Sequence, residues 1–398
     1  MDGKPRVLRQ VGNLLFAQVA SQMGDAAFGV LLLWSVLEMT SSKLVVGAVA
    51  TLNYLPVLLF GMLGGLAADR LPRRGVMVLA DAVRAAVAFA LPILAMRGLL
   101  DPWLLAVAGF LLFTASAFFN PARDAAIPAL VGADELVSAN AVIQTSVPLG
   151  WLLGPAFCSL FLRWYPPQTL FAMVGVLFLI SVAFLARLPR LPASARAGAS
   201  TSSELLGGLR VAGRDVVMRW LLVITAVDNL LIMGPAVVGV PLLVKEVLGG
   251  GGREYALLEA ALAVGVLAGL PLAAWLNRRF GQGKILIAGI FLDGITYLPL
   301  LWLRSVTAVA VVIAFHGLAI PMITVTRASL VQRIIPPEHL GRVFALIGMT
   351  VVGLTAVSAG LTGVAATLAP VNVIFGVIAV GASLCGPLAW MSRAFREA

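Results

Sequence analysis

Long apolar runs, separated by short polar turns, constrain the fold of this chain more than any single motif does. A helix needs about 20 apolar residues to cross roughly 30 Å of hydrocarbon, and the runs are of about that length. Hydrophobic residues make up 61% of the chain and charged residues 12%, which is outside the range of soluble domains. The two-residue alternation of a membrane barrel is missing. The sequence therefore predicts an all-α integral membrane protein.

The apolar runs predict twelve transmembrane helices in two six-helix bundles. The predicted spans lie near residues 11–38, 44–68, 76–96, 102–119, 135–162, 168–188, 217–246, 255–276, 284–303, 306–332, 340–366 and 371–392. A segment rich in Ala, Ser, Gly and Arg separates the sixth span from the seventh. We therefore expect an N-terminal bundle over residues 1–189, a cytoplasmic linker over 190–215 and a C-terminal bundle over 216–398.

The two halves show signs of an internal repeat. An offset of 204 residues aligns Gly65 with Gly269, Arg74 with Arg278, Arg123 with Arg327, Leu136 with Leu340 and Ala141 with Ala345. The register fails at other positions, since Asp69 falls on Ala273. Related halves are typical of membrane transporters.

The basic residues indicate the orientation in the membrane. The formal net charge is +10, but the 28 Lys and Arg residues are spread thinly between apolar runs, so we expect no nucleic-acid partner. With a cytoplasmic N-terminus, those on the outer side are Lys43, Arg97, Arg163, Lys245, Arg253 and Arg304. This bias predicts a multi-pass protein of the cell (plasma or inner) membrane with both termini in the cytoplasm.

A charged turn joins the second and third predicted spans, in the stretch GMLGGLAADRLPRR. Its small residues Gly61, Gly64 and Gly65 would let a neighbouring helix approach closely. Asp69, at the membrane edge, can face the positive end of a helix or a nearby arginine. A plain charged turn between two membrane helices is the alternative interpretation.

The spacing in this turn resembles the signature of the major facilitator superfamily, G-x-x-x-D-R-x-G-R-R. Here it is carried by Gly65, Asp69, Arg70, Arg73 and Arg74, with Pro72 in place of the usual glycine. The resemblance implies a twelve-helix transporter in which this motif latches the cytoplasmic side in the outward-facing state.

Two further stretches resemble that superfamily. In the fifth span, Gly150, Gly154 and Pro155, followed by Cys158 and Ser159, resemble the antiporter motif g-x-x-x-G-P-x-x-G-G, which implies export. Glycine and proline are also ordinary in membrane helices, which leaves the motif open to a purely structural interpretation.

The second of these stretches is NPARDAAIPALVGADELVSANAVIQ. It resembles the branch that contains siderophore exporters, macrolide efflux proteins and lysophospholipid transporters. We expect an amphipathic segment on the cytoplasmic surface, tied to adjacent loops by Arg123 and Asp124, or else a simple solvated loop.

Polar residues inside the predicted spans are the candidates for transport, because a charge in hydrocarbon is costly unless it faces protein or water. Gln18, Ser21, Gln22 and Asp25 share one helix face, which we expect to line a cavity. The seventh span repeats the pattern with Thr225, Asp228 and Asn229. Further candidates are Asn53, Asp81, Asn140, Gln144, Glu259, Asp293 and His316.

Three of these polar groups allow a structural interpretation. His316 fits a hydrogen-bonded packing residue better than a proton relay. Asp81 and Arg84 fit an internal structural pair. The fourth span lacks the arginine that many drug–proton antiporters of the superfamily carry there.

Asp25 and Asp228 are the predicted ion-coupling acids. At 1.5 Å per residue, they lie about 20 Å and about 16 Å into their spans, near the middle of the membrane. A carboxyl group there can take up and release a proton, while Gln18, Gln22 and Asn229 supply neutral hydrogen bonds. Alternatively, Asp25 bridges a helix contact near Gly24.

These patterns favour a monomeric secondary-active exporter of amphipathic small molecules such as drugs, macrolides or siderophores, working by alternating access. A lysophospholipid flippase and a non-transporting membrane scaffold or receptor are the alternatives. The sequence contains no nucleotide loop, metal-ligand cluster or nucleophile–base pair, so we expect neither an enzyme nor a cofactor. A proton gradient is the expected source of energy, and the lipid bilayer is the expected environment.

Overall fold

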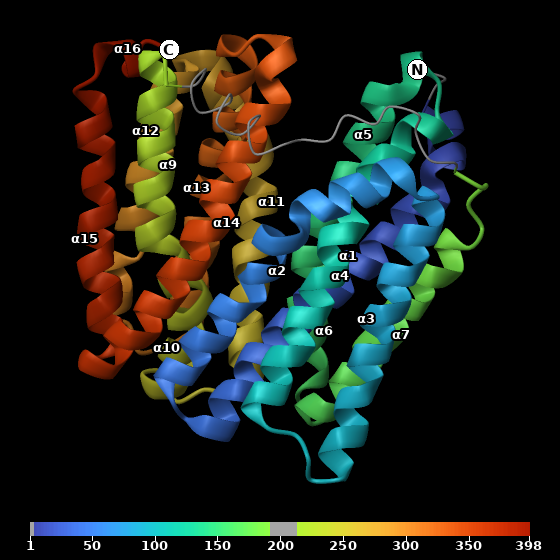
Figure 1. The fold of residues 1–398 in the computed structure, drawn as a ribbon. Helices are drawn as coiled ribbons and strands as arrows, with labels where there is room; N and C mark the ends of the chain where they lie inside the picture. Colours follow the sequence, from blue (N-terminus) through green and yellow to red (C-terminus); the bar gives the residue numbers. More distant parts are fainter. Residues whose placement is uncertain (1–3, 192–212) are drawn as a thin grey trace. The chain divides into compact units, whose positions relative to one another are not determined.

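The computed structural model of this protein describes residues 4–191 and 213–398. Within these ranges all regular secondary structure is helical. Most of the predicted linker, residues 190–215, lies outside the described residues. The all-α prediction is confirmed for the part of the chain that the structure describes (Figure 1).

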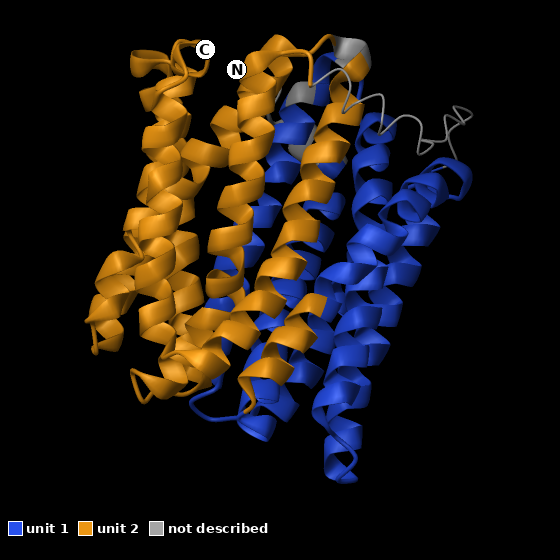
Figure 2. Ribbon diagram, turned by 60° about the vertical axis from the view of Figure 1, so that its left-hand side comes forward, with its two compact units in different colours: residues 1–41, 52–199 blue, residues 42–51, 200–398 orange. Residues whose placement is uncertain are grey.

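The chain divides into two compact units (Figure 2). Unit 1 consists of Met1–Ser41 and Leu52–Ala199, and unit 2 consists of Ser42–Thr51 and Ser200–Ala398. One helix, α2, therefore begins in unit 2 and continues in unit 1. The hydroxyl group of Thr51 fixes that first part, because it donates a hydrogen bond of 3.0 Å to the carbonyl oxygen of Ala356 within unit 2.

The helices before the linker are α1 (Lys4–Thr40), α2 (Lys43–Arg70), α3 (Arg73–Met96), α4 (Pro102–Leu130), η1 (Ala133–Glu135), α5 (Leu136–Gln144), α6 (Ser146–Phe161) and α7 (Pro167–Leu185). Those after it are α9 (Val216–Gly234), η2 (Pro235–Gly239), α10 (Val240–Glu246), α11 (Gly252–Phe280), α12 (Gln282–Ile295), η3 (Leu298–Leu301), α13 (Val306–Ile334), α14 (Pro337–Leu368), α15 (Val371–Trp390) and α16 (Arg393–Arg396). Short polar residues begin several of them. The Asp101 carboxylate, for example, accepts hydrogen bonds from the backbone N–H groups of Trp103 and Leu104 at the start of α4.

Twelve candidate membrane spans lie within the described residues, as predicted. Three predicted spans are not regular α-helices throughout. The fifth is divided between α5 and α6, where Pro148 has no N–H group to donate to the carbonyl of Gln144. The seventh contains the π-helical segment η2, which ends beside Pro241. In the ninth, α12 ends at Ile295 and the 3-10 segment η3 follows within the span. The fourth helix runs on to Leu130, well past its predicted end at residue 119.

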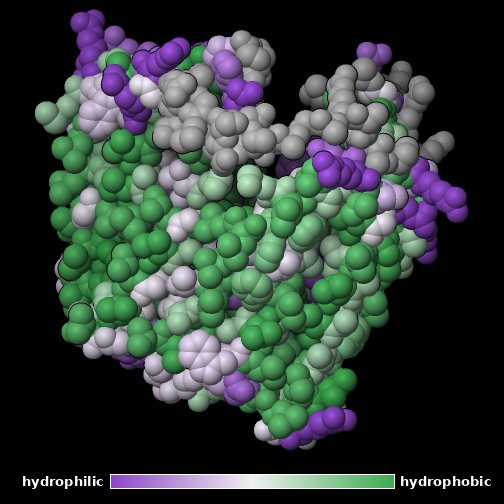
Figure 3. Space-filling view, in the orientation of Figure 1, coloured by the Kyte–Doolittle hydropathy of each residue, from purple (hydrophilic) through white to green (hydrophobic). Residues whose placement is uncertain are grey.

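Apolar side chains cover the flanks of the helices in each unit, and hydrophilic side chains gather toward the helix ends (Figure 3). On α15 an exposed apolar stripe recurs at helical spacing, formed by Val373, Val377, Val380, Leu384 and Leu388. Such a stripe would be unfavourable in water, but it matches the hydrocarbon of a bilayer.

Glycine allows helices to pack backbone against backbone in both units. A Cβ atom at Gly64 of α2 would lie 2.0 Å from the carbonyl oxygen of Ala117 in α4. In unit 2, a Cβ atom at Gly265 of α11 would lie 1.9 Å from the carbonyl oxygen of Ala314 in α13. The expectation of close packing is wrong for Gly61 and Gly65, because a Cβ atom there would meet nothing within 4 Å.

We predict that Gly64→Ala destabilises the protein and that Gly61→Ala, three residues earlier on the same helix, does not. The added methyl group at Gly64 must separate α2 from α4, which should cost about 1–3 kcal/mol. At Gly61 the methyl group enters open space, and alanine favours the helix. Melting temperatures in detergent micelles would measure both effects, and equal values for the two variants would contradict the packing described.

Candidate functional site

The predicted polar face of α1 is enclosed within unit 1. Gln18, Ser21 and Gln22 are buried, and the side chain of Asp25 keeps 16% of its surface exposed. The prediction that this whole face lines a cavity is therefore wrong for the first three residues. Neighbouring helices cover them, and Asp25 alone of the four retains access to the surroundings.

The antiporter-like motif of α6 explains part of this covering. A Cβ atom at Gly150 would lie 2.4 Å from Cβ of Gln22, and one at Gly154 would lie 2.7 Å from the carbonyl oxygen of Met23. The glycines therefore let α6 lie directly on the backbone of α1 beside Asp25. Pro155 lies inside α6, and Cys158, three residues later, is buried against Ala27 of α1.

Arg84 of α3 is the central charge of unit 1, and its side chain has no exposed surface. Its Nη1 atom donates hydrogen bonds to Oδ1 of Asp81 and to Oγ of Ser21, each at 2.7 Å. Ser21 donates in turn to the same Asp81 oxygen at 3.0 Å. The predicted pair of Asp81 and Arg84 therefore exists, and Ser21 ties it to α1.

Asp25 is the second acid at this arginine. Its Oδ2 atom lies 3.6 Å from Nη2 of Arg84 and accepts a hydrogen bond of 3.3 Å from Ser116 of α4. Its Oδ1 atom has no hydrogen-bond partner among the described residues. We did not predict the link from Asp25 to Arg84, because residues on different helices share no spacing that a sequence pattern reveals.

Aromatic rings surround the guanidinium group of Arg84. Its Cζ atom lies 4.9 Å from the ring centre of Phe119 in α4 and 5.6 Å from that of Phe178 in α7. A cation over an aromatic face is attracted by the ring quadrupole, and more strongly where water is excluded. Together with Asp81 and Asp25, the rings hold one positive charge within the apolar interior of unit 1.

Unit 2 contains a different set of charges. Asp228 of α9 is buried and interacts electrostatically with Arg327 of α13 and with Asp293 of α12. Asn229 uses its side-chain N–H group within its own helix, donating to the carbonyl oxygen of Thr225 at 2.8 Å. Asp228 is thus near charged partners, whereas the amide of Asn229 is already engaged.

The candidate residue Asn53 of α2 is also buried, and it packs beside Gly109 of α4 in unit 1. Its side-chain oxygen has no hydrogen-bond partner among the described residues. None of the contacts described above joins it to Asp25.

The charged turn after α2 is held to the segment that follows α7. Nη1 of Arg74 donates a hydrogen bond of 2.8 Å to the carbonyl oxygen of Leu188, and the backbone N–H group of Arg73 donates to that of Leu191. Asp69 forms no hydrogen bond or ion pair with the described residues. In this conformation Arg73 and Arg74 therefore bind the segment that follows α7, and the Asp69 carboxylate has no partner among the described residues.

Arg123 and Asp124 correct another prediction. They lie inside α4, which is a continuous helix through this stretch, and they bind each other through an ion pair of 2.8 Å. Arg123 also donates a hydrogen bond to Asn120 one turn earlier, while Asp124 is 55% exposed. Because their bonding is local to the helix, they do not tie this segment to adjacent loops.

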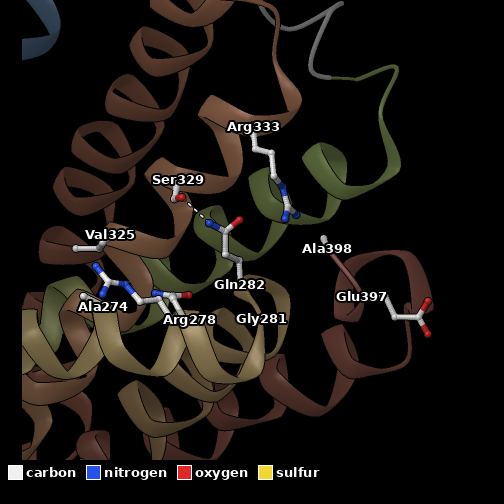
Figure 4. A pocket seen from close by; sticks show the side chains of 10 residues that line it. Ala274, Arg278, Gly281, Gln282, Val325, Ser329, Arg333, Glu397 and Ala398 are labelled. Atoms are coloured by element: carbon white, nitrogen blue, oxygen red, sulfur yellow. Dashed lines mark hydrogen bonds between the residues drawn. The ribbon is translucent and has the colours of Figure 1, made fainter.

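A cavity of ≈ 590 Å³ lies at the end of unit 2 that carries the C-terminus. Figure 4 shows Arg278 of α11, Gln282 of α12 and Arg333 of α13 around it. Gln282 donates a hydrogen bond to Ser329 across this cavity. The lining of this cavity includes none of the predicted transport residues. Separately, the described residues contain no group of three or more side chains that could hold a metal ion.

Comparisons with known proteins agree with this architecture. A family model described as a transmembrane secretion effector matches residues 8–394. Macrolide efflux protein A of Streptococcus pyogenes is 26% identical over 336 residues, covering 83% of each chain. The multidrug efflux pump Tap of Mycolicibacterium fortuitum is 25% identical over 92% of this chain and 94% of its own. The enterobactin exporter EntS of Shigella boydii serotype 4 is 27% identical, covering 90% and 86%.

Solved structures show the same fold at low sequence identity. The nucleoside transporter NupG aligns with a TM-score of 0.74 at 13% identity, covering 95% of this chain and 98% of that one. A bacterial homologue of the iron transporter ferroportin aligns with a TM-score of 0.72 at 18% identity, covering 98% of both chains. Because the family model spans nearly the whole sequence, this chain belongs to the transmembrane secretion effector family of the major facilitator superfamily.

Proposed function

We propose that this protein exports amphipathic small molecules of the macrolide, drug or siderophore class and is driven by a proton gradient. Its family is one of membrane transporters, and the relatives named above are a macrolide efflux protein, a multidrug efflux pump and a siderophore exporter. These names favour export over the lipid flippase considered from the sequence. They likewise favour transport over a scaffold or receptor.

The observation that supports proton coupling is that Arg84 binds its two acids unequally. Asp81 is fully buried and lies 2.7 Å from the guanidinium group, whereas Asp25 lies 3.6 Å away and is partly exposed. A proton arriving from outside the network would reach Asp25 more readily than Asp81. Protonation of Asp25 would leave Arg84 held by Asp81 and Ser21, which weakens the link between α1 and α3.

This change offers a physical basis for alternating access. A ligand or proton shifts a conformational equilibrium only by binding one state better than the other. In this proposal, the state in which α1 and α3 are less tightly linked, within unit 1, binds the proton at Asp25 better than the other state does. We propose that Asp228, with Arg327 beside it, is the corresponding acid in unit 2.

We also propose the orientation that the basic residues predict, with both termini and the linker in the cytoplasm. The charged turn from Gly65 to Arg74 would then lie on the cytoplasmic side. In this proposal Asp69 gains a partner in another conformational state, where the motif acts as a latch.

We predict that Asp25→Asn abolishes pH-gradient-driven transport and keeps substrate binding. The amide preserves the size of the side chain but cannot be deprotonated, so it cannot carry a proton through the cycle. Transport of a macrolide, a siderophore and a cationic dye into inside-out proteoliposomes, with and without a pH gradient, measures the loss.

Glu38→Gln is the matched control, since Glu38 is an exposed acid on the same helix. It should retain wild-type transport. Full gradient-driven transport by Asp25→Asn would exclude Asp25 as the coupling residue. Coupling would then have to be sought in the acids of unit 2.

We further predict that Asp69→Asn slows transport about tenfold, equivalent to about 1.4 kcal/mol, while leaving the melting temperature unchanged. The carboxylate has no partner to lose in the conformation described, so folding should not suffer. Asp134→Asn, at an exposed acid on η1, serves as the control. Transport at the wild-type rate by well-expressed Asp69→Asn protein would contradict the proposed role of Asp69 as a latch.

A further inference from the structure

His316 of α13 is buried in unit 2 within a closely packed polar cluster. Its imidazole ring stacks on the ring of Tyr297 at a centroid distance of 4.4 Å. Its Nδ1 atom lies 2.8 Å from the hydroxyl oxygen of Thr296, and its Nε2 atom lies 3.6 Å from Oδ1 of Asp293. Both ring nitrogens therefore face polar groups of one segment, at the end of α12.

The hydroxyl group of Thr296 fixes which ring nitrogen carries hydrogen. Its oxygen lies 2.7 Å from the carbonyl oxygen of Leu292, a group that can only accept a hydrogen bond. The single hydroxyl hydrogen must lie between these two oxygens, because they would otherwise repel each other. The hydroxyl oxygen therefore accepts from His316, and Nδ1 carries a hydrogen atom.

This assignment leaves Nε2 of His316 facing Asp293. In a neutral imidazole with hydrogen on Nδ1, the Nε2 atom presents a lone pair. A lone pair opposite an ionised carboxylate is unfavourable at a buried site, because burial removes both groups from bulk water. One additional proton removes the conflict, either as an imidazolium beside a carboxylate or as a carboxylic acid beside a neutral imidazole.

The surrounding charges favour that proton. Asp228 of α9 interacts electrostatically with Asp293, and Tyr297 interacts with Asp293, Asp228 and Glu259 of α11. From α15, Cys385 also interacts with Asp228. Arg327 is the cationic side chain that interacts with Asp228 here. If Asp293, Asp228 and Glu259 were all ionised, the single charge of Arg327 would not balance them, and a bound proton reduces the net negative charge of this apolar interior.

We propose that Asp293 and His316 share one bound proton and form a second proton-binding site, inside unit 2. The geometry of Thr296, His316 and Asp293 carries the site itself. Its use in transport rests on the proposed function, in which it would exchange its proton once in each cycle. Unit 2 would then take part in coupling through this histidine–aspartate pair together with Asp228, with which Asp293 interacts, whereas unit 1 uses Asp25.

Nitrogen NMR of the purified protein tests the site directly, because the chain has only 2 histidines. In protein labelled with ¹⁵N-histidine, His339→Gln leaves His316 as the single signal. We expect hydrogen on Nδ1 throughout, and an Nε2 signal that shifts between about pH 5 and about pH 8, as the proton bound by His316 and Asp293 is lost. A bare Nδ1 with hydrogen on Nε2 at every pH would overturn the proposal.

Two variants sharpen this test. In Asp293→Asn the side-chain N–H group can donate to Nε2, so His316 should stay neutral with hydrogen on Nδ1 at every pH. Thr296→Val removes the acceptor of Nδ1 and should shift hydrogen toward Nε2. Thr355→Val is the matched control, because Thr355 is also buried and donates to a carbonyl four residues earlier, at 2.8 Å. An Asp293→Asn spectrum that titrates like wild type would contradict the shared proton.

Transport assays separate this inference from the proposed function. If both are correct, Asp293→Asn also loses pH-gradient-driven transport. If the NMR signals show the shared proton but wild-type vesicles show no gradient-driven transport, the proton-binding site stands and proton-coupled export fails. If wild-type transport is gradient-driven but Nδ1 of His316 carries no hydrogen, proton-coupled export stands and the proton-binding site in unit 2 fails.

Discussion

One fully buried arginine determines how unit 1 is built. Arg84 has no exposed surface, so its charge must be balanced inside the protein, since an isolated charge in an apolar interior is strongly unfavourable. Asp81 and Asp25 supply the balance, while Ser21 and two aromatic rings complete the surroundings. These groups come from α1, α3, α4 and α7. A change of charge at the accessible acid is therefore felt by four helices together.

Small residues place this charge network where it is. In a bilayer the hydrophobic effect does not drive helices together, so close packing has to do so. Gly150 and Gly154 bring α6 onto α1 beside Asp25, and Gly64 brings α2 onto α4. The same device joins α11 to α13 in unit 2 at Gly265. Gly64, Gly150 and Gly154 are thus structural in this conformation, and the chemistry lies on the helices that they position.

The sequence was sufficient to predict the twelve spans, because apolar runs of that length have few alternatives in water or lipid. It also placed Asp25 and Asp228 among the polar groups within the spans. It did not predict the partner of Asp25, since Arg84 is brought to it by packing between α1 and α3. The internal repeat does not extend to the charged residues. At the 204-residue offset, Asp25 aligns with Asn229, whose amide binds within its own helix, and Arg84 aligns with Ala288.

The central claim is that Arg84 is a structural charge held tightly by Asp81 and loosely by Asp25. Melting temperatures of single variants in detergent test it directly. Arg84→Leu should lower the melting temperature by on the order of 10 °C, from a loss of about 3–5 kcal/mol, while Arg97→Leu at the exposed end of the same helix should not. Asp81→Asn should be clearly more destabilising than Asp25→Asn. An Arg84→Leu protein as stable as Arg97→Leu, or equal losses for the two acids, would contradict this account.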